Sequence, residues 1–525
     1  MEKSAEVLAF LGMVGNAILE GLALLLVAGL GLAVVIIGIL YVIDSMQTTQ
    51  AIRRNYPVVG RFRYFFEHMG EFFRQYFFAM DREELPFNRA QRSWAYRAAK
   101  NLDNTVPFGS TRDLRVEGSV IFSPTAFPTL SEDGVEADDI VVGPGCIKPF
   151  RTRNIVHISG MSYGALSKPA VQALANGARK AGMWLNTGEG GLTPYHLKAG
   201  CDVVVQIGTA KYGVRDEQGK LSDKKLAEVA HYKQVRMFEI KLSQGAKPGK
   251  GGILPGEKVS ADVAEMRGIP EGKDSISPNR HPDIRNVGEL LDSIGRIRKV
   301  TGKPVGFKAV LGGEEFLDEL FTEINKRGKA SAPDFITVDS CDGGTGAAPM
   351  PLMDDVGLPL RESLPILVDK LNAYGLRKRI RVIASGKLIT PADVAWALCV
   401  GADFTVTGRG FMFALGCIQA LQCNKNTCPT GITTHNPRLQ KGLEPKSKAV
   451  RVADYARNLE KEVGVIAHSC GVREPRQLNR SHARVVIGKG KSKPLNALWP
   501  DIEPSSLRHR SRRFSLSQKR RPDSR

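Results

Sequence analysis

The sequence predicts an α/β protein built as a (β/α)8 TIM barrel, preceded by an N-terminal transmembrane helix. Short apolar runs alternate with amphipathic stretches from about Phe108 onward. Glycine-rich turns directly follow these runs, and a long uncharged apolar segment precedes them all. The 525 residues, with 42% hydrophobic and 24% charged residues, suffice for one large domain with additional segments.

The apolar segment covers residues 21–43, which are 23 residues without a formal charge. At about 1.5 Å per residue, such a helix crosses the roughly 30 Å hydrocarbon core of a bilayer. A cleaved signal peptide is the alternative, but the run is long for one and no clear small-residue cleavage site follows. The basic residues that follow are Arg53, Arg54, Arg61 and Arg63. The positive-inside rule therefore predicts a single-pass membrane protein, anchored by residues 1–50, with its catalytic domain in the cytoplasm.

Residues 51–107 are predicted to form a basic, aromatic and helical linker beside the membrane. Nine phenylalanine and tyrosine residues lie between Arg61 and Met80, together with Arg63 and Arg74. This mixture suits a helix at the headgroup boundary. Packing of the same aromatic residues on the soluble domain or on another subunit is an equal alternative.

The C-terminal segment, residues 488–525, is predicted to be a basic disordered tail. Its final 18 residues carry eight Arg or Lys against one Asp, so they supply +7 of the net charge of +20. No apolar periodicity is present from Leu507 onward. Anionic lipid or non-specific nucleic acid is electrostatically allowed as a partner. A solvated tail is expected, and no specific nucleic-acid partner is predicted.

Eight apolar runs are the candidate strands of the barrel domain, which we place at residues 108–487. They are Val156–Ser159, Trp184–Thr187, Val203–Ile207, Phe238–Leu242, Val305–Val310, Phe335–Asp339, Arg381–Ala384 and Phe404–Thr407. A doubly wound sheet is the structural alternative, but no G-x-G-x-x-G motif follows any of these strands. Polar and glycine-rich residues gather just after the strand ends, which is typical of barrels.

A cysteine triplet, Cys417, Cys423 and Cys428, has the spacing C-x5-C-x4-C and is followed by Pro429. Three thiolates this close suit a three-iron cluster, or a four-iron cluster that is incompletely ligated. A zinc site with a fourth ligand such as His435, or buried unpaired cysteines, are the alternatives. The other cysteines are too few for a disulfide scaffold, and we expect reduced thiols at Cys146, Cys201, Cys341, Cys399 and Cys470.

Glycine-rich loops follow several of the predicted strands. Residues 160–164 follow the first strand, residues 188–191 the second and residues 342–346 the sixth. Glycine there lets the backbone approach a planar or phosphorylated ligand. The loops after the seventh and eighth strands, which often hold a phosphate in barrels, contain Ser385-Gly386-Lys387 and Gly408-Arg409-Gly410. With an iron-sulfur site nearby, FMN is the economical cofactor, because it accepts one electron at a time and passes on two.

Motifs spread over about Phe108 to Val486 occur in an order that indicates a family. They are Met161-Ser162-Tyr163-Gly164, Asn186-Thr187-Gly188-Glu189-Gly190-Gly191, Glu239-Ile240-Lys241, Gln244-Gly245-Ala246-Lys247-Pro248-Gly249, Leu254-Pro255-Gly256, Asp342-Gly343-Gly344-Thr345-Gly346 and the cysteine triplet. Together they resemble the FMN-binding synthase domain of glutamate synthase large subunits. The resemblance implies a (β/α)8 barrel with FMN and a 3Fe-4S cluster. It also implies reduction of 2-iminoglutarate, formed from 2-oxoglutarate and ammonia, to L-glutamate.

The same resemblance assigns roles to individual residues. The cysteine triplet would ligate the cluster, while Glu189 and Lys247 would face the substrate. The FMN would be lined by Met161, Ser162, Gln206, Lys241, Gly344, Gly346, Gly386, Gly408 and Arg409. A dicarboxylate needs a cation such as Lys247, and an imine needs a carboxyl group such as Glu189 to protonate it or hydrogen-bond it. Without the resemblance, the simpler interpretation of Lys247 is a solvated surface lysine, and that of Glu189 is a residue that only caps a turn.

The chain also departs from the family pattern. Family large subunits begin with an amidotransferase domain that has an N-terminal cysteine, whereas residue 2 here is Glu2 and an apolar segment follows. We therefore expect no glutamine hydrolysis within this chain. We also expect no β-helical domain of the kind that follows the synthase domain in the family, because few residues follow Val486. Ile253 stands where the family loop carries a glutamine at the substrate. Loss of that amide bears on substrate choice, because a site built around a hydrogen bond discriminates strongly by it.

The sequence thus predicts a membrane-anchored, stand-alone glutamate synthase-like flavoenzyme. Nothing in the chain resembles a pyridine-nucleotide domain, so the electron donor should be a separate reductase subunit, a ferredoxin or a membrane carrier. One alternative, favoured by Ile253, is an FMN oxidoreductase on another amine or oxoacid, such as an N-methylglutamate-type synthase. The other is a non-catalytic membrane redox relay. FMN binding and substrate-dependent flavin reoxidation separate these three hypotheses.

Overall fold

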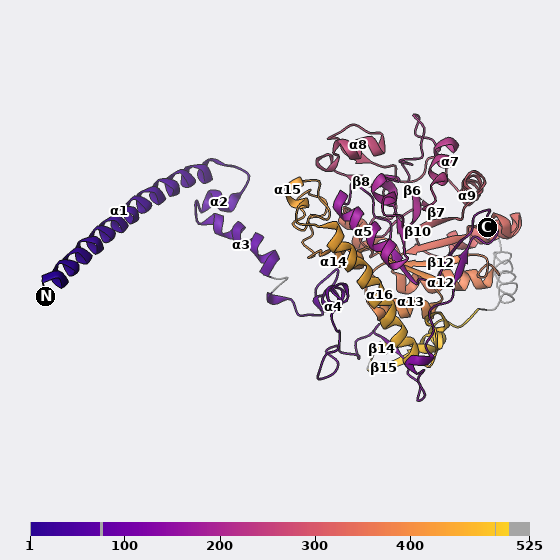
Figure 1. Ribbon diagram of the computed structural model, residues 1–525. Coiled ribbons are helices and arrows are strands. Elements are labelled where there is room, and N and C mark those ends of the chain that lie inside the picture. The colour runs from indigo at the N-terminus through magenta and orange to yellow at the C-terminus, as the bar shows by residue number, and fades with distance from the viewer. Residues whose placement is uncertain (1, 74–76, 489, 503–525) are drawn as a thin grey trace, which may run out of the picture. The chain divides into compact units, whose positions relative to one another are not determined.

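The computed structural model describes residues 2–73, 77–488 and 490–502 (Figure 1). The chain divides into two compact units, the first ending at Arg89 and the second beginning at Ala90. Arg74, Tyr76 and the tail from Leu507 to Arg525 lie outside the described residues. We describe each unit by itself.

The second unit is built around a closed barrel of eight parallel strands. In spatial order around the barrel these are β4 (Val156–Ile158), β5 (Trp184–Asn186), β6 (Asp202–Ile207), β7 (Val235–Lys241), β10 (Val305–Val310), β11 (Phe335–Asp339), β12 (Arg381–Ser385) and β13 (Phe404–Thr407). Pairing of β13 with β4 closes the ring. The predicted TIM barrel is confirmed, and all eight predicted strands are present.

The strands form because each is a short, β-branched or aromatic run that is buried on both faces. All four residues of β13 and all five of β11 are buried, for example. The predicted bounds differ from the observed ones by a few residues. The largest difference is at β7, which begins at Val235 instead of Phe238 because Val235 already pairs with Val203 of β6.

Helices follow the strands and cover the barrel (Figure 1). They are α5 (Lys168–Ala181), α6 (Pro194–Leu197), α7 (Asp223–His231), α9 (Val287–Thr301), α10 (Glu315–Arg327), α12 (Leu360–Ala373), α13 (Pro391–Val400), α14 (Arg409–Leu415) and α16 (Pro445–Ser469). Local signals set their ends. In α5 the hydroxyl of Ser167 accepts from the amide of Ala170, and Gly182 ends the helix with φ of 72°. The long α16 packs against α5, α13 and α14.

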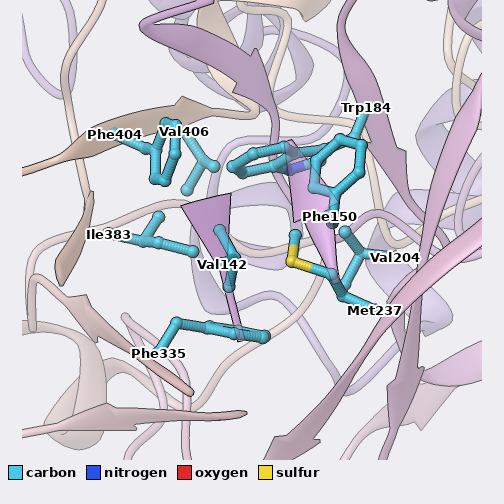
Figure 2. Packing of buried hydrophobic residues seen from close by; sticks show 9 residues of the cluster. All are labelled: Val142, Phe150, Trp184, Val204, Met237, Phe335, Ile383, Phe404 and Val406. Carbon is cyan, nitrogen blue, oxygen red and sulfur yellow. The ribbon is translucent and has the colours of Figure 1, made fainter. Parts of the chain in front are cut away.

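Short elements connect or extend the barrel. They are α8 (Ala261–Arg267), α11 (Met350–Asp355), α15 (Pro437–Gln440), β1 (Val120–Phe122), β2 (Ile140–Val142), β3 (Phe150–Thr152), β8 (Ile253–Leu254) and β9 (Ser275–Ile276). The hairpin formed by β2 and β3 closes the amino-terminal end of the barrel. Its Val142 and Phe150 pack against Trp184, Phe335 and Phe404, which begin their strands (Figure 2). This apolar plug leaves the carboxyl ends of the strands as the open end of the barrel.

The two ends of the second unit extend beyond the predicted barrel. Helix α4 (Arg89–Ala99) belongs to this unit, because Trp94 donates to Glu462 at 2.9 Å and Tyr96 donates to the carbonyl of Cys417 at 2.6 Å. At the other end, residues 491–498, which belong to the predicted tail, form regular elements. Strand β15 (Lys491–Pro494) pairs with β14 (Ala483–Gly488), and α17 (Leu495–Leu498) follows with Leu495 buried.

The first unit contains α1 (Glu2–Met46), α2 (Ala51–Asn55) and α3 (Gly60–Phe73). The apolar part of α1, Ala9–Met46, is long enough and apolar enough to cross a membrane, and none of its most apolar window is buried. The predicted span at residues 21–43 lies within it. A signal sequence near the N-terminus can also form an apolar helix that meets these criteria, so α1 is either a membrane anchor or a signal sequence.

Candidate active site

A pocket of about 1180 Å³, counting its part open to solvent, lies at the carboxyl ends of the barrel strands. Such clefts are the usual ligand sites of barrels. All nine residues predicted for the cofactor line it, and so do Glu189 and Lys247. The structure therefore brings together eleven residues that are spread over residues 161–409 of the chain. Their individual roles stay predictions.

Glu189 lies in a short 3-10 turn, Gly188–Gly190, after β5. It shares one part of the pocket, which we call the cationic corner, with Lys241, Lys247 and Arg267. The ammonium of Lys241 lies 3.0 Å from its Oε2 atom. Burial acts to raise the pKa of Glu189, but the charges of Lys241 and Lys247 outweigh it and hold the pKa below its ordinary value. Glu189 is therefore a carboxylate at neutral pH.

Two glycines make the space that Glu189 occupies. A Cβ atom added to Gly252 would overlap the carboxylate, and one added to Gly208 would lie 2.6 Å from the Cβ atom of Glu189. The side chain thus sits between two bare stretches of backbone. Substitution of either glycine by alanine would displace it.

Lys247 lies on the loop after β7 and is only 3% exposed, so the solvated-lysine interpretation is wrong. Burial, which is the largest cause, and the charge of Lys241 together lower the pKa of Lys247 to about 8, although Glu189 acts to raise it. Its ammonium is within electrostatic reach of the Glu189 carboxylate, which already pairs with Lys241. A ligand carboxylate in the pocket would give Lys247 a partner of its own.

Arg267, the last residue of α8, is a third cation of this corner that we did not predict. It is 5% exposed and lines the pocket. Its guanidinium donates to the hydroxyl of Ser275 at 3.1 Å and to the carbonyl of Tyr163 at 3.2 Å, while Nε has no partner among the described residues. In the sequence it looks like an ordinary basic residue at a helix C-terminus, so no local signal marks it.

A polar network below the pocket orients two amide side chains. One carboxylate oxygen of Glu239, Oε1, accepts from Asn186 at 2.9 Å and from Gln206 at 2.7 Å, and Oε2 accepts from Thr337 at 2.6 Å. Because both amides give their NH2 groups to Glu239, their carbonyl oxygens point elsewhere. The carbonyl oxygen of Asn186 accepts from the amide of Gly188, which opens the turn that carries Glu189.

Loss of Glu239 should therefore loosen both the cofactor side and the substrate side of the pocket. We expect Glu239→Ala to lower the free energy of unfolding by about 2–5 kcal/mol, since each buried donor left unpaired costs about 1–3 kcal/mol. FMN affinity should fall roughly tenfold or more by the same reasoning. Glu239→Gln keeps an acceptor for both amides and should restore most of the loss. Thermal unfolding and fluorescence titration with FMN measure the two effects, and equal FMN affinity in all three proteins would contradict the assignment.

Another part of the pocket, lined by Gly346, Gly386 and Arg409, has the features of a phosphate site. Gly386 has φ of 125° and its Cβ position is filled by Ser340, so only glycine fits there. A Cβ atom on Gly346 would meet nothing within 4 Å, which leaves room for a ligand. Arg409 is held in place by the carbonyl of Thr345 at 2.5 Å. Bare backbone beside an arginine fits the phosphate of a mononucleotide.

The cysteine triplet lies on an irregular loop at the edge of this pocket, which Cys423 lines. Burial raises the pKa of Cys417, and the sulfurs of Cys423 and Cys428 contribute to the increase, so the three groups are within electrostatic reach of one another. In the described chain, however, no three His, Cys, Asp or Glu side chains meet at metal-binding distance. The donor set fits an iron-sulfur cluster by its chemistry, and the cluster itself stays a prediction.

The alternative zinc interpretation finds no support at His435. Its Nε2 atom lies 2.9 Å from the carbonyl oxygen of Gly164, so only Nδ1 is left for a metal, and no metal-binding group of three such side chains is found among the described residues. The other predicted thiols agree with the structure, since all eight cysteines are free.

A closed barrel with a mononucleotide-sized pocket, a cationic corner around one carboxylate and a cysteine loop at the pocket edge defines a TIM-barrel oxidoreductase. The conserved region in glutamate synthase matches residues 129–473. The chain belongs to the glutamate synthase family and is an enzyme of the oxidoreductase class.

Two relatives found by sequence agree with that membership. The glutamate synthase large subunit-like protein YerD of Bacillus subtilis is 39% identical over 506 residues, which are 89% of this chain and 96% of that protein. The archaeal NADPH glutamate synthase of Methanocaldococcus jannaschii is 34% identical over 63% of this chain and 61% of its own length. Among solved structures, a mutant chimera of (S)-mandelate dehydrogenase aligns over 75% of this chain and 98% of its own, with 15% identity and a TM-score of 0.46.

Proposed function

We propose that this protein is a membrane-anchored glutamate synthase-like enzyme that reduces 2-iminoglutarate, formed from 2-oxoglutarate and ammonia, to L-glutamate. The observation that carries the proposal is the cationic corner, where the carboxylate of Glu189 lies among Lys247, Lys241 and Arg267 in the pocket that also collects the predicted FMN residues. Mono-carboxylate substrates would leave part of this positive charge unmatched.

FMN fits the part of the pocket between Gln206 and Arg409. When bound, it supplies hydride transfer to the substrate and accepts single electrons. Lys241 would contact the flavin ring and, through its 3.0 Å ion pair, couple the position of Glu189 to it. Gly386 and Arg409 would hold the phosphate.

The substrate fits the remaining space, beside Glu189. Lys247 and Arg267 would bind its carboxylates, since both are buried cations that line the pocket. Because Glu189 stays ionised, its carboxylate would accept a hydrogen bond from the N–H of a protonated imine and stabilise that cation. A cationic imine is the form that accepts hydride most readily. Ammonia would be taken from solution.

Electrons would enter through the cysteine loop at the edge of the pocket. Cys417, Cys423 and Cys428 would hold an iron-sulfur cluster, with a 3Fe-4S type expected from three ligands. A separate reductase subunit, a ferredoxin or a membrane carrier would supply the electrons. The proposed location is a single-pass membrane protein with the barrel in the cytoplasm.

Anaerobic single-turnover reoxidation tests the proposal. The purified full chain is reduced photochemically, and the flavin absorbance is followed after addition of 2-oxoglutarate with ammonium. We expect fast reoxidation with one glutamate per flavin, and slow reoxidation when either reactant is omitted. A bound flavin that stays reduced in the presence of both reactants would overturn the glutamate assignment.

Ile253 favours a second candidate, an FMN oxidoreductase that acts on another amine or oxoacid. Its side chain lines the pocket close to the cationic corner, where an amide would otherwise offer a hydrogen bond. The same reoxidation assay with methylammonium in place of ammonium, and with shorter and longer oxoacids, separates the two candidates. Faster reoxidation with one of these than with the standard pair would establish the second.

The pKa of Lys247 predicts a pH dependence of substrate capture. Below about pH 8 its ammonium is charged in the free enzyme, and above that pH it is progressively neutral. We therefore expect kcat/KM for 2-oxoglutarate to fall up to about tenfold per pH unit above pH 8, because this ratio reports the free enzyme. Lys247→Arg keeps its charge over the whole range and should remove this limb of the profile, even if its activity is lower. Because free ammonia also increases with pH, the profile is measured at a constant calculated concentration of NH3.

A further inference from the structure

The apolar helix α1 is followed by a turn and the two short helices α2 and α3 (Figure 1). A buried ion cluster closes this turn. Asp44, two residues before the end of α1, is 0% exposed. Its carboxylate pairs with Arg53 of α2 at 2.6 Å and with Arg61 of α3 at 2.7 Å, and it accepts from the backbone amide of Val58 at 3.0 Å. The start of α3 is therefore fixed beside the end of α1.

The backbone between the two arginines is equally constrained. A Cβ atom on Gly60 would lie 2.8 Å from the carbonyl oxygen of Ile52, so glycine is needed where α2 and α3 meet. Val58 has φ of 67°, a conformation that β-branched residues rarely adopt, at the point where its amide donates to Asp44. The turn is a defined structure and not a loose linker.

Helix α3 presents one aromatic face. Phe62, Phe65, Phe66 and Phe73 recur at a spacing that places them on the same side of a helix. The first three are 56–62% exposed, and Phe73, whose ring lies against Phe77 and Phe78, is 39% exposed. The described residues of the first unit therefore leave most of this face uncovered. Arg61 and Arg63 flank this face near its start.

We propose that α3 lies in the headgroup layer of the membrane that α1 enters, with its aromatic face toward the acyl chains. The Asp44 cluster supports this placement because it ties the start of α3 to the end of α1. A carboxylate at the end of an apolar span is stable where it meets water and headgroups, and here two arginines, one of them on α3, meet it at that depth. Continuity with α1 then places the aromatic face at the lipid boundary, which phenylalanine beside arginine suits. The inference rests on the anchoring role of α1 in the proposed function.

Depth-dependent fluorescence quenching in the full-length protein tests this inference. Phe66→Trp places a probe on the aromatic face, and Glu67→Trp, at an exposed polar position one residue away, is the matched control. Each protein is placed in vesicles of phosphatidylcholine and phosphatidylglycerol, with or without bromine on the acyl chains. The signal of the native protein, with its 4 Trp, is subtracted. We expect the emission of the probe at position 66 to be quenched at least twice as strongly as that of the probe at position 67.

Equal quenching at the two positions, or none, would overturn the inference and indicate that the barrel or a second copy covers the aromatic face. Phe65→Trp on the same face repeats the test if Phe66→Trp fails to fold. Failure of the native protein to float with vesicles would overturn both the anchor and the inference. Glutamate formation by the same samples is recorded separately, so the enzymatic proposal stands or falls on its own result.

Discussion

Replacement of Glu189 by glutamine should lower kcat with 2-oxoglutarate and ammonium by about 10²–10⁴-fold, the range that a positioned acid-base or charge-stabilising group contributes. The two side chains have nearly the same shape, so the flavin pocket and the space between Gly208 and Gly252 are retained. What is lost is the negative charge beside a cationic imine. The effect should fall on kcat more than on KM, because without this charge less of the bound imine is protonated, and the cationic imine is the form that accepts hydride.

The measurement is steady-state and single-turnover kinetics of Glu189→Gln, with FMN content checked by absorbance. Glu217→Gln, an exposed position outside the pocket, is the matched control and should behave as the native enzyme. The native ion pair between Lys241 and Glu189 also predicts that the flavin spectrum of the variant shifts slightly. Turnover within threefold of the native value would remove Glu189 from the mechanism.

The barrel was predictable because its signals are local. Each strand is a short buried apolar run, as in β11 and β13, and each candidate loop begins where such a run ends. Parallel strands in a closed barrel bring all their carboxyl ends to one rim. The fold therefore predicted that the loops after the strands meet at one rim, and the family resemblance assigned Ser162, Gly344 and Arg409 to the cofactor. The structure places all three around one pocket.

Other features could not be predicted because they depend on pairing between distant residues. Arg267 enters the pocket only because the loop after β7 folds back over the barrel, which no periodicity reveals. The role of Glu239 depends on Asn186, Gln206 and Thr337, which come from three other strands. A polar residue inside an apolar run predicts that it needs hydrogen-bond partners, but it does not predict which residues they are.

The C-terminal segment illustrates the same limit. Residues 491–494 are polar and basic and have no apolar pattern, yet they form β15 because the edge of β14 is available for pairing. Edge pairing depends on backbone hydrogen bonds and not on side-chain composition. Composition therefore could not reveal β15.

Replacement of Cys428 by serine should abolish reduction of the flavin by the electron donor but leave reoxidation of the flavin by the substrate intact. Cys428 is 8% exposed and belongs to the only cysteine triplet of this spacing in the sequence. Loss of outer-shell partners alone costs about 10–100-fold in metal affinity, so loss of a ligand should cost at least about as much. We expect the variant to lose its iron and its cluster EPR signal. Electron transfer from the external donor to the flavin should be lost with them.

The flavin half-reaction of this variant should survive. Because the cationic corner around Glu189 and Lys247 is built from other loops, photoreduced flavin should still be reoxidised by 2-oxoglutarate and ammonium within about threefold of the native rate, as expected for a site that keeps its transition-state contacts. Cys470→Ser, at a buried cysteine of similar exposure (6%), controls for the cost of a buried hydroxyl. Iron content that is equal in the two variants and the native protein would show that the triplet holds no cluster. Loss of both half-reactions in Cys428→Ser alone would show that the loop is part of the substrate pocket instead.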